Sequence, residues 1–400
     1  MNNKTPKYFI ILLFFFFSMI VNLYPQQAKD ESATNQKMQI ADTIRAIAGQ
    51  EKKKDSYWRR LLQGNVDRTH EKKIDLSFAA SPSYTREASF GIGGMASGLY
   101  RLNRKDSIMP PSDITLVFNA SVQGFYAIEA RGNNYFNDHR SVLSYDMGFT
   151  SKPLGFWGIS YDACGTNPVI DYTRQQIKID INYQYKVLKN FYVGTTLDFS
   201  YTSVTKIGNL SYLEGQNRSF TATGIGISLQ YDSRDFIPNP KRGLYVMLRQ
   251  SVFPEIFGNT KRTLYRTTFI ADTYQKVWNG GILAFDLFGQ FNSNNSPWAL
   301  REELGSNNRM RGYYAGRYID NNIITGQAEL RQHLVQRFGI TTWIGGGTVF
   351  PSVNQLKMKN ILPSYGIGFR WEFKHNVNAR IDYGFGKDTS GFVFNIAEAF

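Results

Sequence analysis

Residues suited to a specific polar contact lie together in a long polar segment of the chain, residues 292–322. Near its middle stand Arg311, Gly312 and Tyr313. An arginine guanidinium can hold a carboxylate through two parallel hydrogen bonds, and such a pair is strongest where water is partly excluded. The triplet therefore predicts a loop tip that is held by an acidic side chain elsewhere in the chain.

Glu329 is the candidate partner of Arg311. The stretch 324–334 alternates between apolar and polar residues, which is typical of a strand with two different faces. Its polar face carries Thr325, Gln327, Glu329, Arg331 and His333. Arg311 can reach Glu329 if this face lines the inside of the protein. The alternative is that the two residues are unrelated polar residues of the same lining.

A second polar constellation lies between two predicted strands. Asp232, Arg234 and Asp235 are followed by Pro238 and Gly243. Side chains of this kind pin a tight turn through bonds to the backbone and salt bridges. A functional cluster at the rim of the protein is the alternative interpretation.

Motifs for catalysis or for metal binding are absent from the sequence. It holds no G-x-S-x-G or H-E-x-x-H, its four histidines are isolated, and Cys164 is its only cysteine. The string 91–96 matches G-x-G-x-x-A, but no helix is predicted to follow it. We therefore expect no enzyme activity, no catalytic residue, no metal and no cofactor.

The composition indicates a chain that crosses a membrane with strands. Aromatic residues make up 15%, with 24 Tyr and 30 Phe, and after residue 25 no apolar run reaches the roughly 18 residues that a spanning helix needs. Backbone groups in lipid must be paired internally, so such a chain can span only as a closed barrel. The formal net charge of +14 is spread along the strands, which favours a polar lumen and a rim facing anionic lipid over nucleic-acid binding.

The strands themselves show as a period of two. The clearest is 177–187, where every odd position is apolar and every even one polar. We expect an all-β fold, a transmembrane antiparallel β-barrel of about 16 strands. The predicted strands are 75–84, 88–100, 113–126, 140–151, 154–162, 175–187, 190–202, 220–232, 243–253, 264–278, 281–291, 323–334, 338–350, 364–373, 377–385 and 391–400.

The N-terminus reads as an export signal over residues 1–25. Lys4 and Lys7 precede the apolar run 8–23, which is too short for a spanning helix; a retained anchor is the alternative. Residues 26–73 are charged and predict a short periplasmic segment, either a solvated tail or a short amphipathic helix. We expect the barrel to occupy 74–400 of a protein exported to a Gram-negative outer membrane.

Strand parity assigns the connections to the two ends of the barrel. With a periplasmic N-terminus, the segment 292–322 follows the eleventh strand and is external, and the turn 236–242 follows the eighth and is periplasmic. The final residue, Phe400, closes the last predicted strand. A terminal aromatic of this kind is what barrel-assembly machinery reads; an interfacial anchor is a compatible second meaning.

Three motifs resemble a known family. The run Tyr231–Asp235 with Pro238 and Gly243, the triplet Arg311–Tyr313, and the closing stretches 365–370 and 380–384 are similar to the barrel of the BamA/TamA-like Omp85 superfamily, the bacterial surface antigen (D15) domain. The resemblance covers residues 75–400. It implies that the segment around Arg311, loop six of the family, folds into the lumen and that Arg311 pairs with acidic groups of the wall.

The resemblance also implies a function. Barrels of this type insert or translocate proteins or lipids at the outer membrane through a weak seam between the first and last strands, and Pro82 in the first strand cannot donate a ladder hydrogen bond. The implied partners are outer-membrane lipids, unfolded outer-membrane proteins or lipid substrates, and a periplasmic or lipoprotein partner. A passive channel or structural barrel is the alternative.

Two features depart from the family pattern. Gly345 stands where the family usually has an aspartate on the thirteenth strand, so we expect half of the clamp on Arg311 to be missing. Residues 26–73 are too short for even one of the periplasmic POTRA domains, and this indicates the POTRA-less branch.

Overall fold

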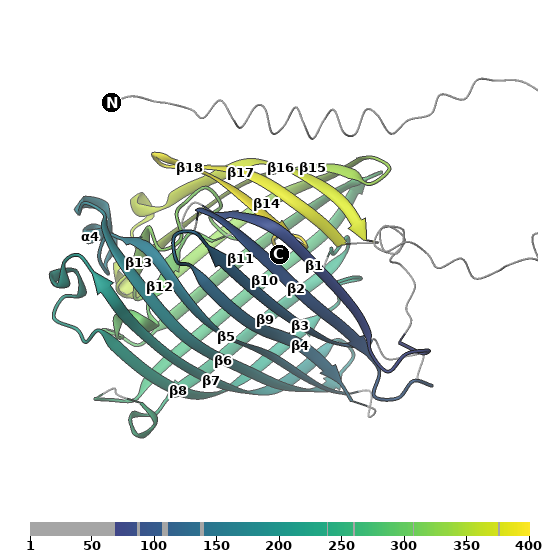
Figure 1. Cartoon of the computed structure of the whole chain (residues 1–400), viewed down its shortest axis with the longest axis horizontal. Coiled ribbons are helices and arrows are strands. Elements are labelled where there is room, and N and C mark those ends of the chain that lie inside the picture. Colours follow the sequence, from purple (N-terminus) through teal and green to yellow (C-terminus); the bar gives the residue numbers. More distant parts are fainter. Residues whose placement is uncertain are drawn as a thin grey trace, which may run out of the picture. The chain divides into compact units, whose positions relative to one another are not determined.

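Sixteen antiparallel strands form the wall of the protein in a computed structural model that describes residues 69–85, 89–105, 111–136, 140–237, 239–258, 261–306, 308–374 and 377–400. The predicted signal peptide and nearly all of segment 26–73 lie outside the described residues. Each strand pairs with the next one along the chain, from β1 to β11 and then from β14 to β18. The strands wind around a common lumen (Figure 1), which confirms the predicted antiparallel β-barrel.

Apart from β18, which has eight residues, the wall strands have the roughly 9–11 residues or more that a tilted strand needs to cross a bilayer. Their bounds are β1 Asp75–Thr85, β2 Ser89–Tyr100, β3 Ser112–Ser121, β4 Tyr126–Tyr135, β5 Ser141–Phe156, β6 Ile170–Leu188, β7 Phe191–Ile207, β8 Ser219–Asp232, β9 Gly243–Phe253, β10 Leu264–Trp278, β11 Gly281–Asn292, β14 Asn322–Val335, β15 Phe338–Phe350, β16 Leu362–Lys374, β17 Val377–Gly386 and β18 Thr389–Ile396. In the described part of the chain, no helix is long and apolar enough to span a membrane.

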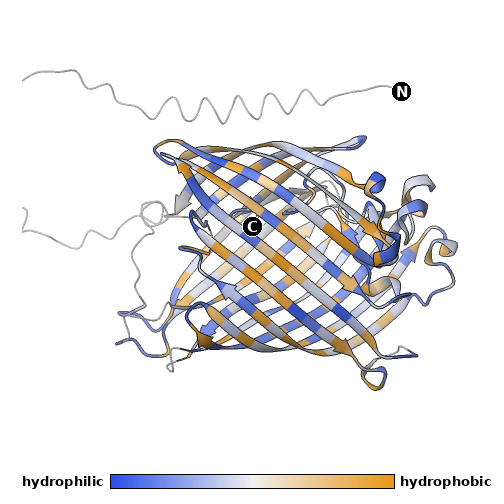
Figure 2. Ribbon diagram, turned by 180° about the vertical axis from the view of Figure 1, so that it is seen from behind, coloured by the Kyte–Doolittle hydropathy of each residue, from blue (hydrophilic) through white to orange (hydrophobic). Residues whose placement is uncertain are grey.

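Alternation along each strand separates a lipid face from a lumen face. In β15, Ile340 and Ile344 are exposed on the outer surface, whereas Thr341 and Trp343 are buried toward the lumen. Figure 2 shows the resulting alternation of hydrophobic and hydrophilic residues along the strands. A strand with period two presents apolar side chains to the lipid and polar side chains to the lumen, as the wall of a membrane barrel requires.

Two predicted strand assignments are wrong, although their number is right. The predicted strand 113–126 corresponds to β3 and to the turn after it, in which Gly124 has a φ of +83°, whereas β4 was not predicted. Conversely, the predicted strands 140–151 and 154–162 are one strand, β5, which ends at Phe156. β5 runs beyond the end of β4 at Ser151, so Pro153 has a ladder on one side only, an edge position in which proline is tolerated.

The last predicted strand, 391–400, is also wrong at its end. β18 stops at Ile396, Ala397 adopts a left-handed φ of +70°, and Glu398 and Ala399 are buried. The chain therefore leaves the wall and its last four residues turn inward. β18 and β1, the two ends of the strand order, lie beside each other.

Short elements in the connections gather at one end of the barrel. They are α4 Tyr161–Thr166, η1 Leu210–Leu213, η2 Glu255–Phe257, η3 Trp298–Leu300, β12 Glu302–Leu304, β13 Tyr318–Asp320, η4 Val353–Gln355 and η5 Met358–Asn360. A hydrophobic cluster that includes Ile159, Cys164, Leu213, Trp298 and Ile319 joins the connections after β5, β7 and β11. These connections all follow odd-numbered wall strands, so they pack together at the end predicted to be external.

The two faces of β15 give a test of the membrane assignment. Ile344 lies at the middle of the strand and is 69% exposed, so Ile344→Lys should destabilise the barrel in lipid vesicles by about 2–4 kcal/mol. Val353→Lys, at a residue 62% exposed in η4, is the matched control and should change stability little. Urea unfolding in vesicles measures both; equal effects would contradict a lipid-facing β15.

Candidate functional site

Loop six, residues 293–321, runs inside the barrel and brings Arg311 to the wall. β12 and β13 pair as a short hairpin that leads the loop inward, and the Arg311 side chain is 0% exposed. The tip needs left-handed backbone: Met310 has a φ of +53° and Gly312 of +102°. A Cβ on Gly312 would lie 2.6 Å from the carbonyl carbon of Gly384 in β17, so only glycine allows this approach.

Arg311 is held by two buried carboxylates. Its Nη2 donates to Glu329 Oε2 at 2.6 Å, and its Nη1 donates to Asp382 Oδ2 at 2.9 Å. The guanidinium also lies over the ring of Trp343, 3.7 Å from the ring centroid. We call Arg311, Glu329 and Asp382 the clamp. Charge-assisted bonds of this kind, shielded from water, fix both the position and the direction of the arginine.

The expectation that half of the clamp is missing is wrong. Gly345 does lack a carboxylate, and a Cβ there would lie 2.5 Å from the carbonyl oxygen of Gly326. Its register partner Gln327 accepts a hydrogen bond from Arg311 Nη2 at 3.3 Å. The second carboxylate comes instead from Asp382 on β17. The sequence did carry this signal, because Asp382 alternates with apolar residues on a face shared with Arg380.

Three further arginines surround the clamp carboxylates. Asp382 also accepts from Arg370 at 2.5 Å and from Arg380 at 2.7 Å, and Glu329 accepts from Arg331 at 2.7 Å. Glu398 binds Arg370 at 2.8 Å and so joins the same system. We call these three arginines, Glu398 and the clamp together the clamp network. Four arginines and three carboxylates share one buried region, so each carboxylate has more than one cationic partner.

The inward turn of the final residues completes the clamp network. The Phe400 carbonyl oxygen accepts a hydrogen bond from Arg331 Nη2 at 3.0 Å, and Asn378 donates to Glu398 at 2.6 Å. The Phe400 ring lies 6.2 Å from the ring of Tyr274. Phe400 thus contacts lumen residues of β10 and β14 rather than ending a wall strand, which differs from the predicted place of a C-terminal barrel signal.

Residues on both sides of Arg311 anchor the tip separately. Arg309 pairs with Asp286 at 2.5 Å and lies over the ring of Phe288. The Tyr313 hydroxyl donates to the Pro363 carbonyl at 2.8 Å and accepts from the Lys387 backbone N–H at 2.7 Å. Residues 309–313 therefore reach from β11 to the turn between β17 and β18.

The outer part of loop six is fixed to β6 and to the connections after β5 and β7. Arg317 donates to the Cys164 carbonyl, and Arg174 pairs with Glu303. Trp298 donates through its backbone N–H to the Gln216 side chain at 2.8 Å. Burial raises the pKa of the Cys164 thiol to about 11, so this lone cysteine is a packing residue with little thiolate at neutral pH.

The Asp232–Gly243 constellation forms a self-contained turn. Asp232 pairs with Arg234 at 2.7 Å, and Asp235 Oδ1 accepts from the backbone N–H groups of Phe236 and Lys241, both at 2.9 Å. Gly243 has a φ of +117°. Pro238 lies outside the described residues. These bonds support the turn-pinning interpretation, and the turn lies at the end of the barrel opposite the α4 connection.

Within the described ranges, no group of three or more His, Cys, Asp or Glu side chains is placed to hold a metal ion. The carboxylates of Glu329 and Asp382 bind the Arg311 side chain of loop six instead.

Sixteen antiparallel strands with a loop locked in the lumen by an arginine–carboxylate clamp define a recognised class of β-barrel. Residues 127–400 match the Omp85 superfamily domain, which is well over half of the chain. The chain therefore belongs to the Omp85 superfamily. A comparison with curated protein sequences finds no match.

Solved structures show the same fold at low sequence identity. BamA from Haemophilus ducreyi lacking POTRA domains 1–3 is 10% identical, with a TM-score of 0.54 over 82% of this chain and 70% of that one. CdiB from Acinetobacter baumannii is 10% identical, with a TM-score of 0.53 over 81% and 60%. CdiB from Escherichia coli is 10% identical, with a TM-score of 0.53 over 82% and 62%. The chain thus spans less than two thirds of the length of both CdiB proteins.

The clamp predicts that removing a single carboxylate charge lowers the free energy of unfolding strongly. Asp382→Asn leaves three arginines around a neutral side chain, and removing one partner of a buried pair costs about 3–5 kcal/mol. Asp146→Asn is the control, because Asp146 and Lys178 are 54% and 52% exposed at 3.6 Å, and such a pair contributes about 0–1 kcal/mol. Urea unfolding compares the two. Equal losses would mean that Asp382 does not hold the arginines.

The glycine at the loop tip predicts a loss of docking rather than of folding. Gly312→Ala places a Cβ against the β17 backbone, so loop six should leave the wall and become sensitive to protease between residues 305 and 316 while the strands stay protected. Gly124→Ala controls for strain alone, since Gly124 also has a positive φ but no atom within 4 Å of the added Cβ. Limited proteolysis would contradict the docking role if both variants resisted cleavage like the wild type.

Proposed function

We propose that this protein inserts or translocates proteins or lipids at the outer membrane of a Gram-negative bacterium. The observation that carries the proposal is the clamp, which ties loop six to β17, in the last hairpin of the barrel. Membership of the Omp85 superfamily supports it. Substrate proteins, membrane lipids, and a periplasmic or lipoprotein partner are the interactions that follow from such a role.

The seam between β1 and β18 supports an opening in the wall. β18 has eight residues, fewer than β17 with ten, because the chain turns inward after Ile396. A short edge strand makes few ladder hydrogen bonds with its neighbour, so separation at this edge costs less than elsewhere in the wall. Pro82 in β1, which cannot donate to a ladder, lies on the other side of the seam.

A passive channel is the second candidate, and the contents of the lumen weigh against it. Loop six lies within the barrel, and the cluster around Trp298 packs the connections after β5, β7 and β11 together at the end at which α4 lies. A pore for free diffusion requires an open lumen, whereas the clamp network holds loop six inside it. The clamp network therefore favours a barrel whose closed state is maintained until a substrate or partner changes it.

Conductance of the purified barrel in planar bilayers separates the two candidates. We expect the wild type to show low conductance and Arg311→Ala to open larger steps, because loop six loses both clamp carboxylates at once. Glu329→Ala should act in the same direction. Asp146→Asn serves as the control and should behave like the wild type. Steady porin-like conductance in the wild type would contradict the proposal in this form.

Depletion in the native bacterium tests the function itself. Loss of the protein should lower the amounts of outer-membrane proteins or alter outer-membrane lipids, measured by membrane proteomics and lipid analysis. Rescue by the wild type but not by Arg311→Ala, at equal expression, is the expected result. Unchanged outer-membrane composition after depletion would favour the passive or structural alternative.

A further inference from the structure

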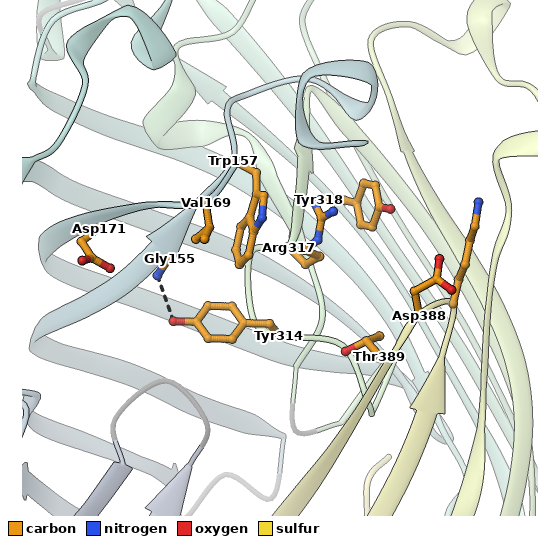
Figure 3. Close-up of a pocket in the computed structure, with 10 residues that line it drawn as sticks. Gly155, Trp157, Val169, Asp171, Tyr314, Arg317, Tyr318, Asp388 and Thr389 are labelled. Atoms are coloured by element: carbon orange, nitrogen blue, oxygen red, sulfur yellow. Dashed lines mark hydrogen bonds between the residues drawn. The ribbon is translucent and has the colours of Figure 1, made fainter. Parts of the chain in front are cut away.

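A pocket with a volume of about 390 Å³ opens beside loop six at the end of the barrel closed by the α4 connection. Figure 3 shows that its walls come from three separate parts of the chain: the start of β6 with the connection after β5, loop six, and the turn between β17 and β18. Its volume is at the lower end of the range of about 300–1,000 Å³ for small-molecule sites. The clamp does not use the side chains that line it.

Aromatic side chains form a fixed wall of this pocket. The rings of Trp157 and Tyr314 meet edge to face with centroids 5.4 Å apart, and the Gly155 backbone N–H donates to the Tyr314 hydroxyl at 2.9 Å. Arg317 lies between the rings of Trp157 and Tyr318, 4.8 Å and 4.6 Å from their centroids. Because these groups hold one another in place, the pocket presents apolar ring surface without first having to order it.

Charged groups of both signs line the other sides. Asp171 stands at one side, and Asp388 stands across from it (Figure 3). Lys387 precedes Asp388 on the turn between β17 and β18 and also lines the pocket. Within the part of the chain that the structure describes, the charged ends of these three residues make no ion pair and no side-chain hydrogen bond. Two carboxylates offer acceptors and one ammonium offers donors, so the pocket suits a ligand whose polar groups both donate and accept.

We propose that this pocket binds one or two sugar units of a glycan. A sugar ring has an apolar C–H face that can lie on an aromatic ring and a rim of hydroxyls that each donate and accept. The two carboxylates are balanced by the Lys387 ammonium and the Arg317 guanidinium, so no net charge favours an ionic ligand, and the four charged groups together disfavour a purely apolar one. The glycan can be the headgroup of a glycolipid in the membrane or a free oligosaccharide, since both present the same chemistry.

Occupancy of the pocket is linked to the position of loop six. The turn that supplies Lys387 and Asp388 also holds the loop tip, because the Lys387 backbone donates to Tyr313 and Thr389 Oγ1 donates to the Gly312 carbonyl at 3.1 Å. A bound sugar would contact loop six and this turn at once. Its binding therefore stabilises the arrangement in which the tip of the loop lies against β17.

Direct binding measured on the purified full barrel tests the proposal, and it needs no translocation activity. One arm titrates a neutral oligosaccharide, maltopentaose, into detergent-solubilised protein and follows it by saturation-transfer difference NMR. The other arm uses nanodiscs with and without a neutral diglycosyl diacylglycerol. Binding of the free oligosaccharide supports the pocket as a general glycan site, and binding in the glycolipid nanodiscs alone supports a glycolipid as the source.

Paired variants decide whether binding takes place in this pocket. Asp171→Ala combined with Lys387→Ala removes one charge of each sign and should weaken binding about tenfold in whichever arm shows it. Glu255→Ala combined with Lys357→Ala, two exposed residues away from the pocket, makes the same change in charge and should leave binding unaltered. The proposal is overturned if neither arm shows binding, if both double variants bind alike, or if an unstructured peptide binds in place of the sugar and is lost in the pocket variant.

Discussion

The burial of a single guanidinium governs the arrangement of this barrel. Arg311 has no exposed surface and is accommodated only because Glu329 and Asp382 neutralise it and Trp343 covers its face. A charge in such a place has few alternative positions of low free energy, because leaving either carboxylate unpaired is costly. The clamp therefore specifies where loop six lies more than it adds to overall stability.

The clamp is also continuous with the wall. Asp382 and Arg380 belong to β17, Arg370 belongs to β16, and Glu398 follows β18. Three elements at the closing edge of the barrel thus share their charges with a loop that begins after β11. Because each carboxylate has several arginines, a shift of one strand changes the bonds of others. The position of loop six and the positions of the last strands are therefore coupled through shared ion pairs.

Much of this arrangement follows from local sequence patterns, and the remainder depends on contacts that no local pattern contains. Period-two alternation was sufficient to place Glu329 in the lumen and to find the Arg311 loop. The second carboxylate was expected at position 345 on β15, where the chain has glycine. Asp382 of β17 supplies it instead, because side chains of strands that are not neighbours can meet in the lumen. β4 was not predicted because its second half contains Gly132, Asn133 and Asn134, which are typical of turns. β5 was divided in two because its extension beyond β4 is a property of the sheet. The inward turn after Ile396 and the three-part pocket likewise exist only in the folded barrel.

The division of the clamp between β14 and β17 has a consequence for how the protein is assembled. When only the strands up to β14 have joined the sheet, Arg311 can meet Glu329 but no second carboxylate, since Asp382 arrives with β17 and Glu398 only after β18. Full docking of loop six is thereby postponed until the last hairpin has been added. The clamp thus serves as a checkpoint, because loop six cannot dock fully in a barrel that still lacks its last strands.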